Sequence, residues 1–417
     1  MNKTLLKILK YVLAPAALLI YLFIESQGEG DFHIFITASQ DLFNHENIFE
    51  KHYGLGFHYF YSVFFAILLH PLTYLPFQIS KFLWLTLNCF FIFRIFQIIK
   101  NLLPLNNFSK NQLLFLRIAG FAFAFRFIFE NIHYSQMTIF LLFLCLQGLQ
   151  LIFSNKPVAG AFLIALGINI KLLPLVLLPY LFYRKFFVAG VLVILFYVGL
   201  LLVPIIFIGY QQNNFLLSNW FHLINPINTN HILDVEERSF HSLSTLLSTL
   251  LIQHVPDIHA MNLKRNIIDV SVEQLHLILN IARCSFIVFS LYFLRSLPFK
   301  SPLGMKHRFW ETSYLLLLIP LIFPHQQHYG FLFICPAFIF CLYHLIQNKN
   351  TIPKTKYFFL VTLSILIYLL CNLKILLGEF NEYYEHYKIL SYGALLLIVL
   401  LANCIPNKDE KEITLEV

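Results

Sequence analysis

Charged residues are scarce in this chain. Asp, Glu, Lys and Arg make up 12% of the 417 residues, whereas hydrophobic residues make up 59%. Soluble domains carry roughly 25% charged residues, so the composition excludes an ordinary soluble protein. The mean hydropathy is +0.72, and the 47 Phe and 21 Tyr suit lipid-facing and interfacial positions. We therefore expect an all-α polytopic membrane protein.

Several patterns with well-defined chemistry are also absent. The seven cysteines form no C-x-x-C pair and lie mostly in apolar runs, which argues against a disulfide framework or a cysteine-metal site. No Asp-x-Asp element stands where a nucleotide-sugar metal site would need one, and no glycine-rich phosphate loop occurs. These absences fit a lipid-phosphate donor, which needs no nucleotide pocket. We therefore expect no cofactor and no metal.

Apolar runs long enough to cross a bilayer, about 17–25 residues each, recur along the chain and can be oriented by flanking Lys and Arg. Lys3, Lys7 and Lys10 place the amino terminus in the cytoplasm. The run 11–25 lacks a small-x-small cleavage pattern, so we expect a first membrane helix and no cleaved signal peptide. Most other basic residues fall on the same side. The net charge of +8 therefore reflects topology, and no nucleic-acid partner is expected.

The stretch 57–76 differs from the other apolar runs. If both 57–76 and 78–99 crossed the membrane, the basic cluster at 100–112 would lie outside, against the charge rule. We therefore expect 57–76 to be a juxtamembrane or re-entrant element on the outer side. The other runs predict about twelve transmembrane helices with both termini cytoplasmic: 11–25, 78–99, 113–129, 137–153, two short helices within 158–183, 187–209, 270–296, 309–324, 330–347, 357–377 and 389–405.

A polar loop, residues 26–58, follows the first apolar run. Asp31 stands on its Gly-Glu-Gly-Asp turn, and apolar residues then recur at helical spacing from Phe32 to Phe43. This pattern predicts a short helix with Asp31 as its N-cap. A carboxylate fixed at the membrane surface can act as the general base that deprotonates an acceptor hydroxyl. A simple cap on a solvated loop is the alternative, and three nearby carboxylates compete for the role of base: Asp41, Glu46 and Glu50.

Lys171 is the clearest ionisable residue within an apolar segment, because both of its flanks are apolar. Such residues are costly in a membrane and are usually functional. We predict that Lys171 binds the donor phosphate; a lysine that snorkels at a helix end is the alternative.

Further polar candidates fall on the predicted outer side. The largest outer loop, 210–265, ends in an amphipathic part that could lie along the membrane surface. The pair His325 and His328 has i, i+3 spacing, but without a nearby carboxylate or cysteine this is weak evidence for a metal site. The predicted phosphate contacts besides Lys171 are His328 and Arg238, and the predicted sugar or acceptor contacts are Gln136, Ser242 and His325.

Six short motifs in chain order resemble those of glycosyltransferase family 87, the polyprenyl-phosphate-mannose-dependent mannosyltransferase-like enzymes of the GT-C superfamily. The resemblance covers roughly residues 10–345. The motifs are Asp31-Phe32-x-x-Phe35; Pro71-Leu72-Thr73-Tyr74-Leu75-Pro76 with Trp84 and Asn88; Ser135-Gln136; Gly160 and Gly167-x-x-x-Lys171-x-x-Pro174; His241-Ser242-Leu243; and Gln327-His328-Tyr329.

The resemblance implies a GT-C fold, with a catalytic membrane domain in 1–345 and further transmembrane helices and a cytoplasmic tail in 346–417. It implies an inverting transferase that moves a mannose-like hexose from a polyprenyl phosphate to a glycolipid or envelope glycan. Asp31 would be the catalytic residue, on the extracytoplasmic face of the bacterial cytoplasmic (inner) membrane. The implied partners are membrane lipids, the polyprenyl-phosphate sugar and the acceptor.

The chain departs from the family pattern in ways that leave the sugar and the acceptor open. Ser135 replaces a glycine, Gln327 replaces the first histidine of a His-His-Tyr element, and His58-Tyr59-Phe60-Tyr61 replaces a Tyr-x-Pro element. Other functions remain open at this point. A lipid-linked sugar flippase would spread charges through the membrane depth, an O-antigen-type polymerase or ligase would rely on arginines in the large loop, and a partner subunit would need no catalysis.

Overall fold

The computed structural model describes residues 12–54, 56–225, 228–294, 298–299 and 304–406. The placement of Lys3, Lys7 and Lys10 and of the carboxy-terminal tail lies outside the described residues. Within the described part the regular structure is helical, with two isolated β-bridges, Tyr53 to Phe57 and Phe240 to Gln327. The predicted all-α class is therefore confirmed.

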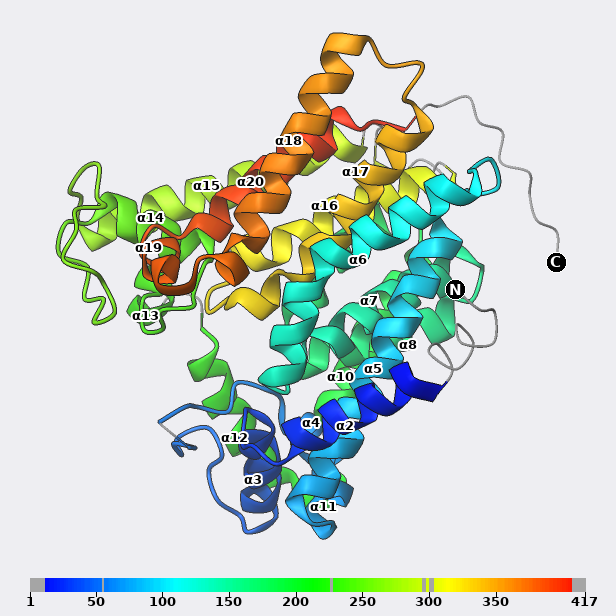
Figure 1. Cartoon of the computed structure of the whole chain (residues 1–417). Coiled ribbons are helices and arrows are strands. Elements are labelled where there is room, and N and C mark those ends of the chain that lie inside the picture. The colour runs from blue at the N-terminus through cyan, green and yellow to red at the C-terminus, as the bar shows by residue number, and fades with distance from the viewer. Residues whose placement is uncertain (1–11, 55, 226–227, 295–297, 300–303, 407–417) are drawn as a thin grey trace.

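The elements follow one another along the chain as shown in Figure 1. They are α2 (Ala14–Ser26), α3 (Phe32–Phe43), α4 (Val63–Leu69), η2 (His70–Tyr74), α5 (Phe77–Leu102), α6 (Lys110–His133), α7 (Thr138–Phe153), α8 (Pro157–Ile170), η3 (Leu173–Val176), α9 (Leu177–Tyr183), α10 (Phe187–Leu202), α11 (Ile205–Ile208), α12 (Tyr210–Leu223), α13 (Thr229–Leu233), α14 (Leu243–Leu251), α15 (Val272–Leu294), α16 (Met305–Ile322), η4 (His328–Ile334), α17 (Cys335–Gln347), α18 (Lys354–Asn372), η5 (Leu373–Leu376), η6 (Gly378–Phe380), α19 (Asn381–His386) and α20 (Ile389–Asn403).

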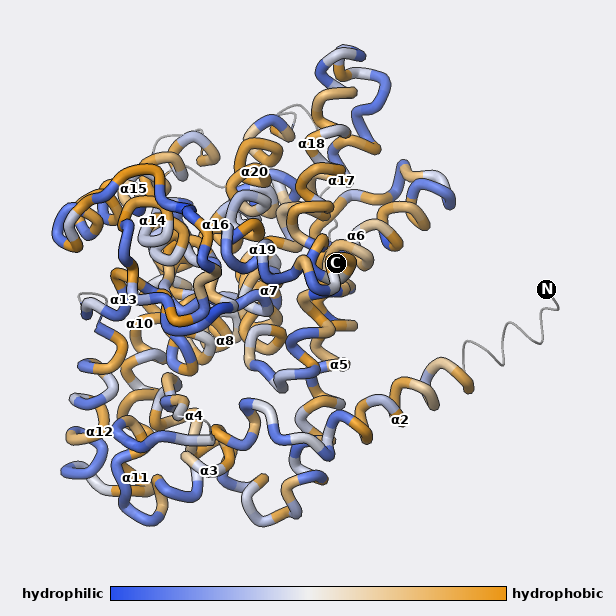
Figure 2. Tube along the Cα trace, turned by 60° about the vertical axis from the view of Figure 1, so that its left-hand side comes forward, coloured by the Kyte–Doolittle hydropathy of each residue, from blue (hydrophilic) through white to orange (hydrophobic). Residues whose placement is uncertain are grey.

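Six helical segments of the described residues are long and apolar enough to cross a membrane: Phe77–Leu102, Lys110–His133, Phe187–Ile208, Val272–Leu294, His328–Gln347 and Lys354–Asn372. The segments Gly378–His386 and Ile389–Asn403, bent by 67°, raise this number to seven if they form one span. Figure 2 shows these helices mainly in the hydrophobic colour and their connections mainly in the hydrophilic one. The chain is a polytopic membrane protein, and the predicted count of twelve spans is not confirmed.

The shorter apolar helices explain most of the difference in count; the predicted span 309–324 corresponds to α16, which has 18 residues and is not among the six. The described part of α2 has 13 residues; at 1.5 Å per residue this part rises about 20 Å, less than the roughly 30 Å hydrocarbon core of a bilayer. α7 and α8 are short in the same way. The stretch 57–76 contains only α4 and η2, as expected for a segment that does not span. Residues 158–183 form two short pieces that part at Lys171, as predicted.

α7 and α8 pack closely through two glycines. A Cβ on Gly160 would lie 2.6 Å from the carbonyl oxygen of Gly148, and a Cβ on Gly148 would lie 2.7 Å from Ile164. The end of α8 is tied to α4, because Ser62 Oγ donates to Asn169 Oδ1 at 2.9 Å. These contacts fix the position at which the chain leaves α8, immediately before Lys171.

The described residues of the segment 210–265 contain three helices, α12, α13 and α14. The amphipathic part corresponds to α14, and its buried residues pack against α13, α15 and α16. Both views place α3, α4, α11 and α12 together at one end of the molecule (Figures 1 and 2).

Candidate active site

Asp31 occupies the N-cap position of α3, as the sequence predicts, but its side chain does not cap the helix within the described structure. The carboxylate instead accepts a hydrogen bond from Gln136 Nε2. The backbone N–H of Asp31 donates to the carbonyl oxygen of Tyr134 at 3.1 Å. The carboxylate is thus held against the turn between α6 and α7, and no helix-capping bond occupies it.

The turn that receives Asp31 is built by buried residues. Ser135 has a φ of 57° and is buried, and its carbonyl oxygen accepts a bond from Trp84 Nε1 at 3.1 Å. The backbone N–H of Gln136 donates to Asn131 O at 2.8 Å. Gly30 has a φ of 65°, and a Cβ there would lie 3.3 Å from the Tyr134 carbonyl oxygen. Three motifs recognised separately in the sequence therefore meet at one place.

Lys171 lies near this carboxylate. The backbone of Lys171 is extended at the end of α8, and its ammonium nitrogen lies 5.5 Å from the centre of the buried Tyr61 ring. Burial lowers the pKa of the Lys171 ammonium to about 8, and the charge of Asp31 opposes this shift. The structure thus brings Asp31, Gln136 and Lys171 together.

The pKa of Asp31 is set by the same surroundings. Burial raises the pKa of the carboxyl above its usual value, while the hydrogen bond from Gln136 and the charge of Lys171 act in the opposite direction. A carboxylate with a raised pKa is a stronger base than one in water. The site therefore favours proton abstraction by Asp31.

Two of the three competing carboxylates of the same loop are paired with a lysine. Lys51 Nζ lies 2.9 Å from Asp41 Oδ2 and 2.5 Å from Glu46 Oε2. Glu50 is exposed. Among these loop carboxylates, Asp31 is the one that faces Gln136 and Lys171.

A second polar group surrounds His328, which opens η4. His328 Nε2 lies 2.9 Å from Glu385 Oε2, and His241 Nε2 lies 3.0 Å from the same oxygen. Lys374 Nζ lies 3.0 Å from Glu385 Oε1. His241 precedes α14, Lys374 belongs to η5 and Glu385 to α19, so the group joins four separate segments.

This group opens into a cavity of about 560 Å³. Arg238 and His328, both predicted to bind phosphate, line it together. The acidic segment 379–385 contributes carboxylates, one of which lies near the guanidinium of Arg238: Arg238 Nη2 is 3.5 Å from Glu382 Oε1. The full lining is Arg238, Ser239, His328, Lys374, Gly378, Glu379, Asn381, Glu382 and Glu385.

Two tyrosines connect the second group to Asp31. Tyr329 follows His328, and its ring centre lies 6.4 Å from that of Tyr134, whose carbonyl oxygen receives the N–H of Asp31. Asn131 Nδ2 donates to Tyr329 O at 3.0 Å. Between the two polar groups, the negative charge of Asp31 also reaches Glu237: burial raises the pKa of that carboxyl, and Asp31 raises it further.

Ser242 and His325 meet at Asp234. Ser242 is fully buried; its hydroxyl donates to Asp234 and accepts from the Thr245 N–H at the start of α14. His325 Nδ1 lies 3.0 Å from Asp234 Oδ1, whereas its Nε2 has no hydrogen-bond partner among the described residues. Ser242 therefore anchors the loop, and a direct sugar contact by Ser242 stays a prediction that its bonding does not favour.

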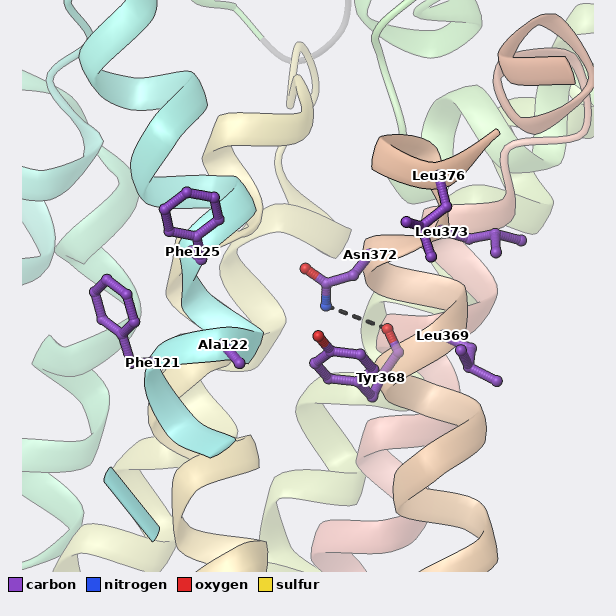
Figure 3. Close-up of a pocket in the computed structure, with 8 residues that line it drawn as sticks. All are labelled: Phe121, Ala122, Phe125, Tyr368, Leu369, Asn372, Leu373 and Leu376. Carbon is purple, nitrogen blue, oxygen red and sulfur yellow. Dashed lines mark hydrogen bonds between the residues drawn. The ribbon is translucent and has the colours of Figure 1, made fainter. Parts of the chain in front are cut away.

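An apolar groove lies between α6 and α18, beside η5. Figure 3 shows two lining residues of α6, Phe121 and Phe125, on one side of the groove and those of α18, among them Tyr368, on the other. Its volume is about 340 Å³. η5 separates the groove from the cavity, since Leu373 and Leu376 line the groove while Lys374 lines the cavity.

Sequence reasoning did not identify Lys374, Glu130 and Glu385. Lys374 did carry a detectable signal, since it interrupts the apolar run from Leu373 to Leu377. Glu385 belonged to an acidic loop whose partners are distant in sequence. No sequence pattern around Glu130 indicated its partners either.

The described residues thus place a carboxylate with a raised pKa beside a lysine, and a charged cavity next to an apolar groove. The model of glycosyltransferase family 87 matches residues 59–295, more than half of the chain. The chain therefore belongs to this family and is a glycosyltransferase. The match includes Gln136, Lys171 and His241, and lies between Asp31 and His328. No curated protein and no solved structure matches the chain.

Proposed function

We propose that the protein transfers a hexose from a polyprenyl-phosphate donor to a hydroxyl of a glycolipid or envelope glycan, with inversion at the anomeric carbon. One observation carries this proposal. The Asp31 carboxylate is withdrawn from its helix, held by Gln136 and placed near Lys171 in buried surroundings. This is the arrangement that a general base and a phosphate-binding cation need.

In the proposed step, an Asp31 oxygen takes the proton of the acceptor hydroxyl as the hydroxyl oxygen bonds to the anomeric carbon. The bond from that carbon to the phosphate oxygen breaks, and its electron pair leaves with the polyprenyl phosphate. In-line displacement places base and leaving group on opposite faces of the sugar, which inverts the configuration. The departing phosphate keeps its negative charge near Lys171.

Other residues hold the substrates in this proposal. His328 and Arg238 contact the donor phosphate from the cavity they line. Gln136 and His325 contact the sugar or the acceptor in this proposal; the buried His325 Nε2 lacks a hydrogen-bond partner among the described residues. Ser242 supports His325 through Asp234.

The groove between α6 and α18 fits the prenyl chain of the donor. A lipid phosphate is apolar along its chain and anionic at its head, and η5 has a groove on one side and a charged cavity on the other (Figure 3). The donor therefore enters sideways from the bilayer. The mannose-like sugar, the extracytoplasmic face, the inner membrane and the cytoplasmic termini belong to the proposal through the family resemblance and the charge rule.

The test is transfer by purified protein in liposomes. Radiolabelled polyprenyl-phosphate hexoses and the corresponding nucleotide sugars are offered separately, with envelope glycolipids as acceptors. We expect product from a lipid-phosphate donor, with the anomeric configuration inverted. Product from a nucleotide sugar alone, or product with retained configuration, would overturn the proposal. Lipid movement without transfer would point to a flippase, although membership of a glycosyltransferase family favours transfer.

A further inference from the structure

We propose that His241, His328 and Glu385 bind one divalent transition-metal ion of the zinc class, with a coordination position open to the cavity. The three residues converge from three segments of the fold. His241 Nε2, His328 Nε2 and Glu385 Oε2 lie 2.9–3.0 Å from one another. All three side chains are buried. The metal site does not depend on the proposed transfer reaction.

The three atoms have the spacing of metal ligands. Zinc binds histidine nitrogen and carboxylate oxygen at about 2.0–2.2 Å, so an ion equidistant from the three atoms would sit about 1 Å out of their plane. Two histidines and one glutamate are a ligand set used in zinc sites that keep one position open. Since His328 and Glu385 line the cavity, that open position can accept water or an anionic oxygen. With the ion bound, a phosphate would contact the ion in place of the His328 ring.

Hydrogen bonding alone accounts poorly for this arrangement. The two Nε2 atoms lie 3.0 Å apart and both face one carboxylate oxygen. If both nitrogens carried hydrogen, the two N–H groups would crowd each other as they compete for that oxygen. A shared cation lets all three atoms act as lone-pair donors at once.

Glu130 stands behind His328 as an outer partner. Its Oε1 lies 3.9 Å from His328 Nδ1, and its buried Oε2 has no hydrogen-bond partner in the described part of the chain. Histidines that bind metals commonly donate their other N–H to a carboxylate, which orients the ring. Glu130 can receive that proton after a small movement.

Lys374 competes with the metal. Its ammonium lies 2.8 Å from His328 Nδ1 and 3.0 Å from Glu385 Oε1, so it compensates the charge of Glu385 when no ion is bound. A bound cation repels this ammonium, and His328 Nδ1 must then carry a proton. The side chain of Lys374 is 23% exposed and borders the cavity, so it can swing outward. Removal of its charge should therefore strengthen metal binding.

Sequence spacing pointed to a different pair. The sequence spacing offered His325 and His328 as a possible metal pair. In the structure His325 contacts Asp234, whereas His328 contacts His241 and Glu385. The partners of His328 are 87 and 57 residues away. The expectation of no metal followed from the absence of a local ligand pattern.

The test is zinc binding by the purified full chain in detergent, after treatment with a chelator and without substrate. Competition with a fluorescent zinc indicator gives the stoichiometry and the dissociation constant. We expect one zinc ion per chain, with binding at least about 100-fold weaker in Glu385→Gln and His328→Gln, and about 10-fold weaker in Glu130→Gln. Lys374→Met, which keeps the side-chain length, should bind more tightly.

His344→Gln is the matched control, because His344 is a buried histidine of α17 outside this group. It should bind zinc as the unaltered chain does. Thermal unfolding of each variant shows whether it is folded. Saturable binding that persists unchanged in both ligand variants would overturn the proposal, as would no binding by the unaltered chain. If the ligand variants do not fold, weaker or equal binding by Lys374→Met would overturn it.

Discussion

The two polar centres of this molecule each hold one carboxylate, and the electrostatic surroundings of the two carboxylates differ. Asp31 faces one amide and a nearby lysine, so little compensates its charge, and burial raises its pKa. Glu385 faces two histidines and the ammonium of Lys374 at about 3 Å. The surroundings of Asp31 favour the protonated form of its carboxyl group. The surroundings of Glu385 stabilise the negative charge of its carboxylate. The comparison supports the proposed proton transfer at Asp31 and the proposed ion binding at Glu385.

Asp31→Asn should have the largest effect. An amide cannot accept the hydroxyl proton, so we expect kcat to fall by about 10² to 10⁴, the usual contribution of a general base. Transfer of labelled sugar in liposomes measures this fall. Asp41→Asn alters a carboxylate of the same loop that is paired with Lys51, and it should stay within a few-fold of the unaltered rate. Equal losses of kcat in both variants would indicate that another residue of the loop is the base.

Lys171→Met should weaken binding of the donor more than it slows the chemical step. A hydrogen bond to a charged group contributes about 1.5–3 kcal/mol, or roughly 10- to 100-fold in KM for the donor. Lys110→Met, at the exposed start of α6, is the control. An unchanged KM would show that Lys171 has no contact with the phosphate.

Glu385→Gln should behave differently from Asp31→Asn. Because Glu385 holds histidines and a lysine at the cavity, its loss should raise KM for the donor about tenfold and leave most of kcat. Initial rates over a range of donor concentrations separate the two constants. A loss confined to kcat would place Glu385 in the chemical step and break the comparison.

Gln136→Leu should shift the pH profile. The base acts when deprotonated, so kcat/KM falls as the pH falls through the pKa of Asp31. The hydrogen bond from Gln136 lowers this pKa, and its removal should move the acid limb to higher pH. Gln40→Leu, on the exposed side of α3, should leave the limb in place. A limb that stays fixed in Gln136→Leu would argue that another group titrates.

Gly160→Ala should have a smaller effect on transfer and a clear effect on stability. The added methyl would meet the Gly148 carbonyl at 2.6 Å, and overpacking of this kind costs about 1–3 kcal/mol. The unfolding temperature in detergent should fall, with a modest rise in donor KM because α8 carries Lys171. Gly199→Ala faces open space on α10 and should unfold near the normal temperature.

Local signals in the sequence predicted the first centre well. The Gly-Glu-Gly-Asp turn and the apolar spacing after it predicted the start of α3, and the length of the apolar stretch 158–183 predicted two short helices there. Both features depend on a short stretch of the chain. The capping role expected for the Asp31 side chain was wrong, because Gln136, from a distant turn, takes the carboxylate.

The second centre and the span count could not be read from the sequence. The second centre forms only when α6, η4, α14 and α19 pack together, because this packing brings His241, His328 and Glu385 into contact. No local spacing in the sequence therefore predicts it. The lengths of α7 and α8 are limited by the turns that bound them, and hydropathy alone extended both into spans. The segment 210–265 was predicted as an outer loop with an amphipathic second part. That part is α14, and two further helices, α12 and α13, precede it.

The most direct test of the central claim is a single turnover by Asp31→Asn with donor already bound. Labelled polyprenyl-phosphate hexose is bound to the unaltered protein and to the variant, its dissociation constant is measured, and acceptor is then added. The account predicts equal donor binding, rapid formation of inverted product by the unaltered protein, and a rate at least about 100-fold lower in the variant. Transfer at the unaltered rate by donor-bound Asp31→Asn would contradict it.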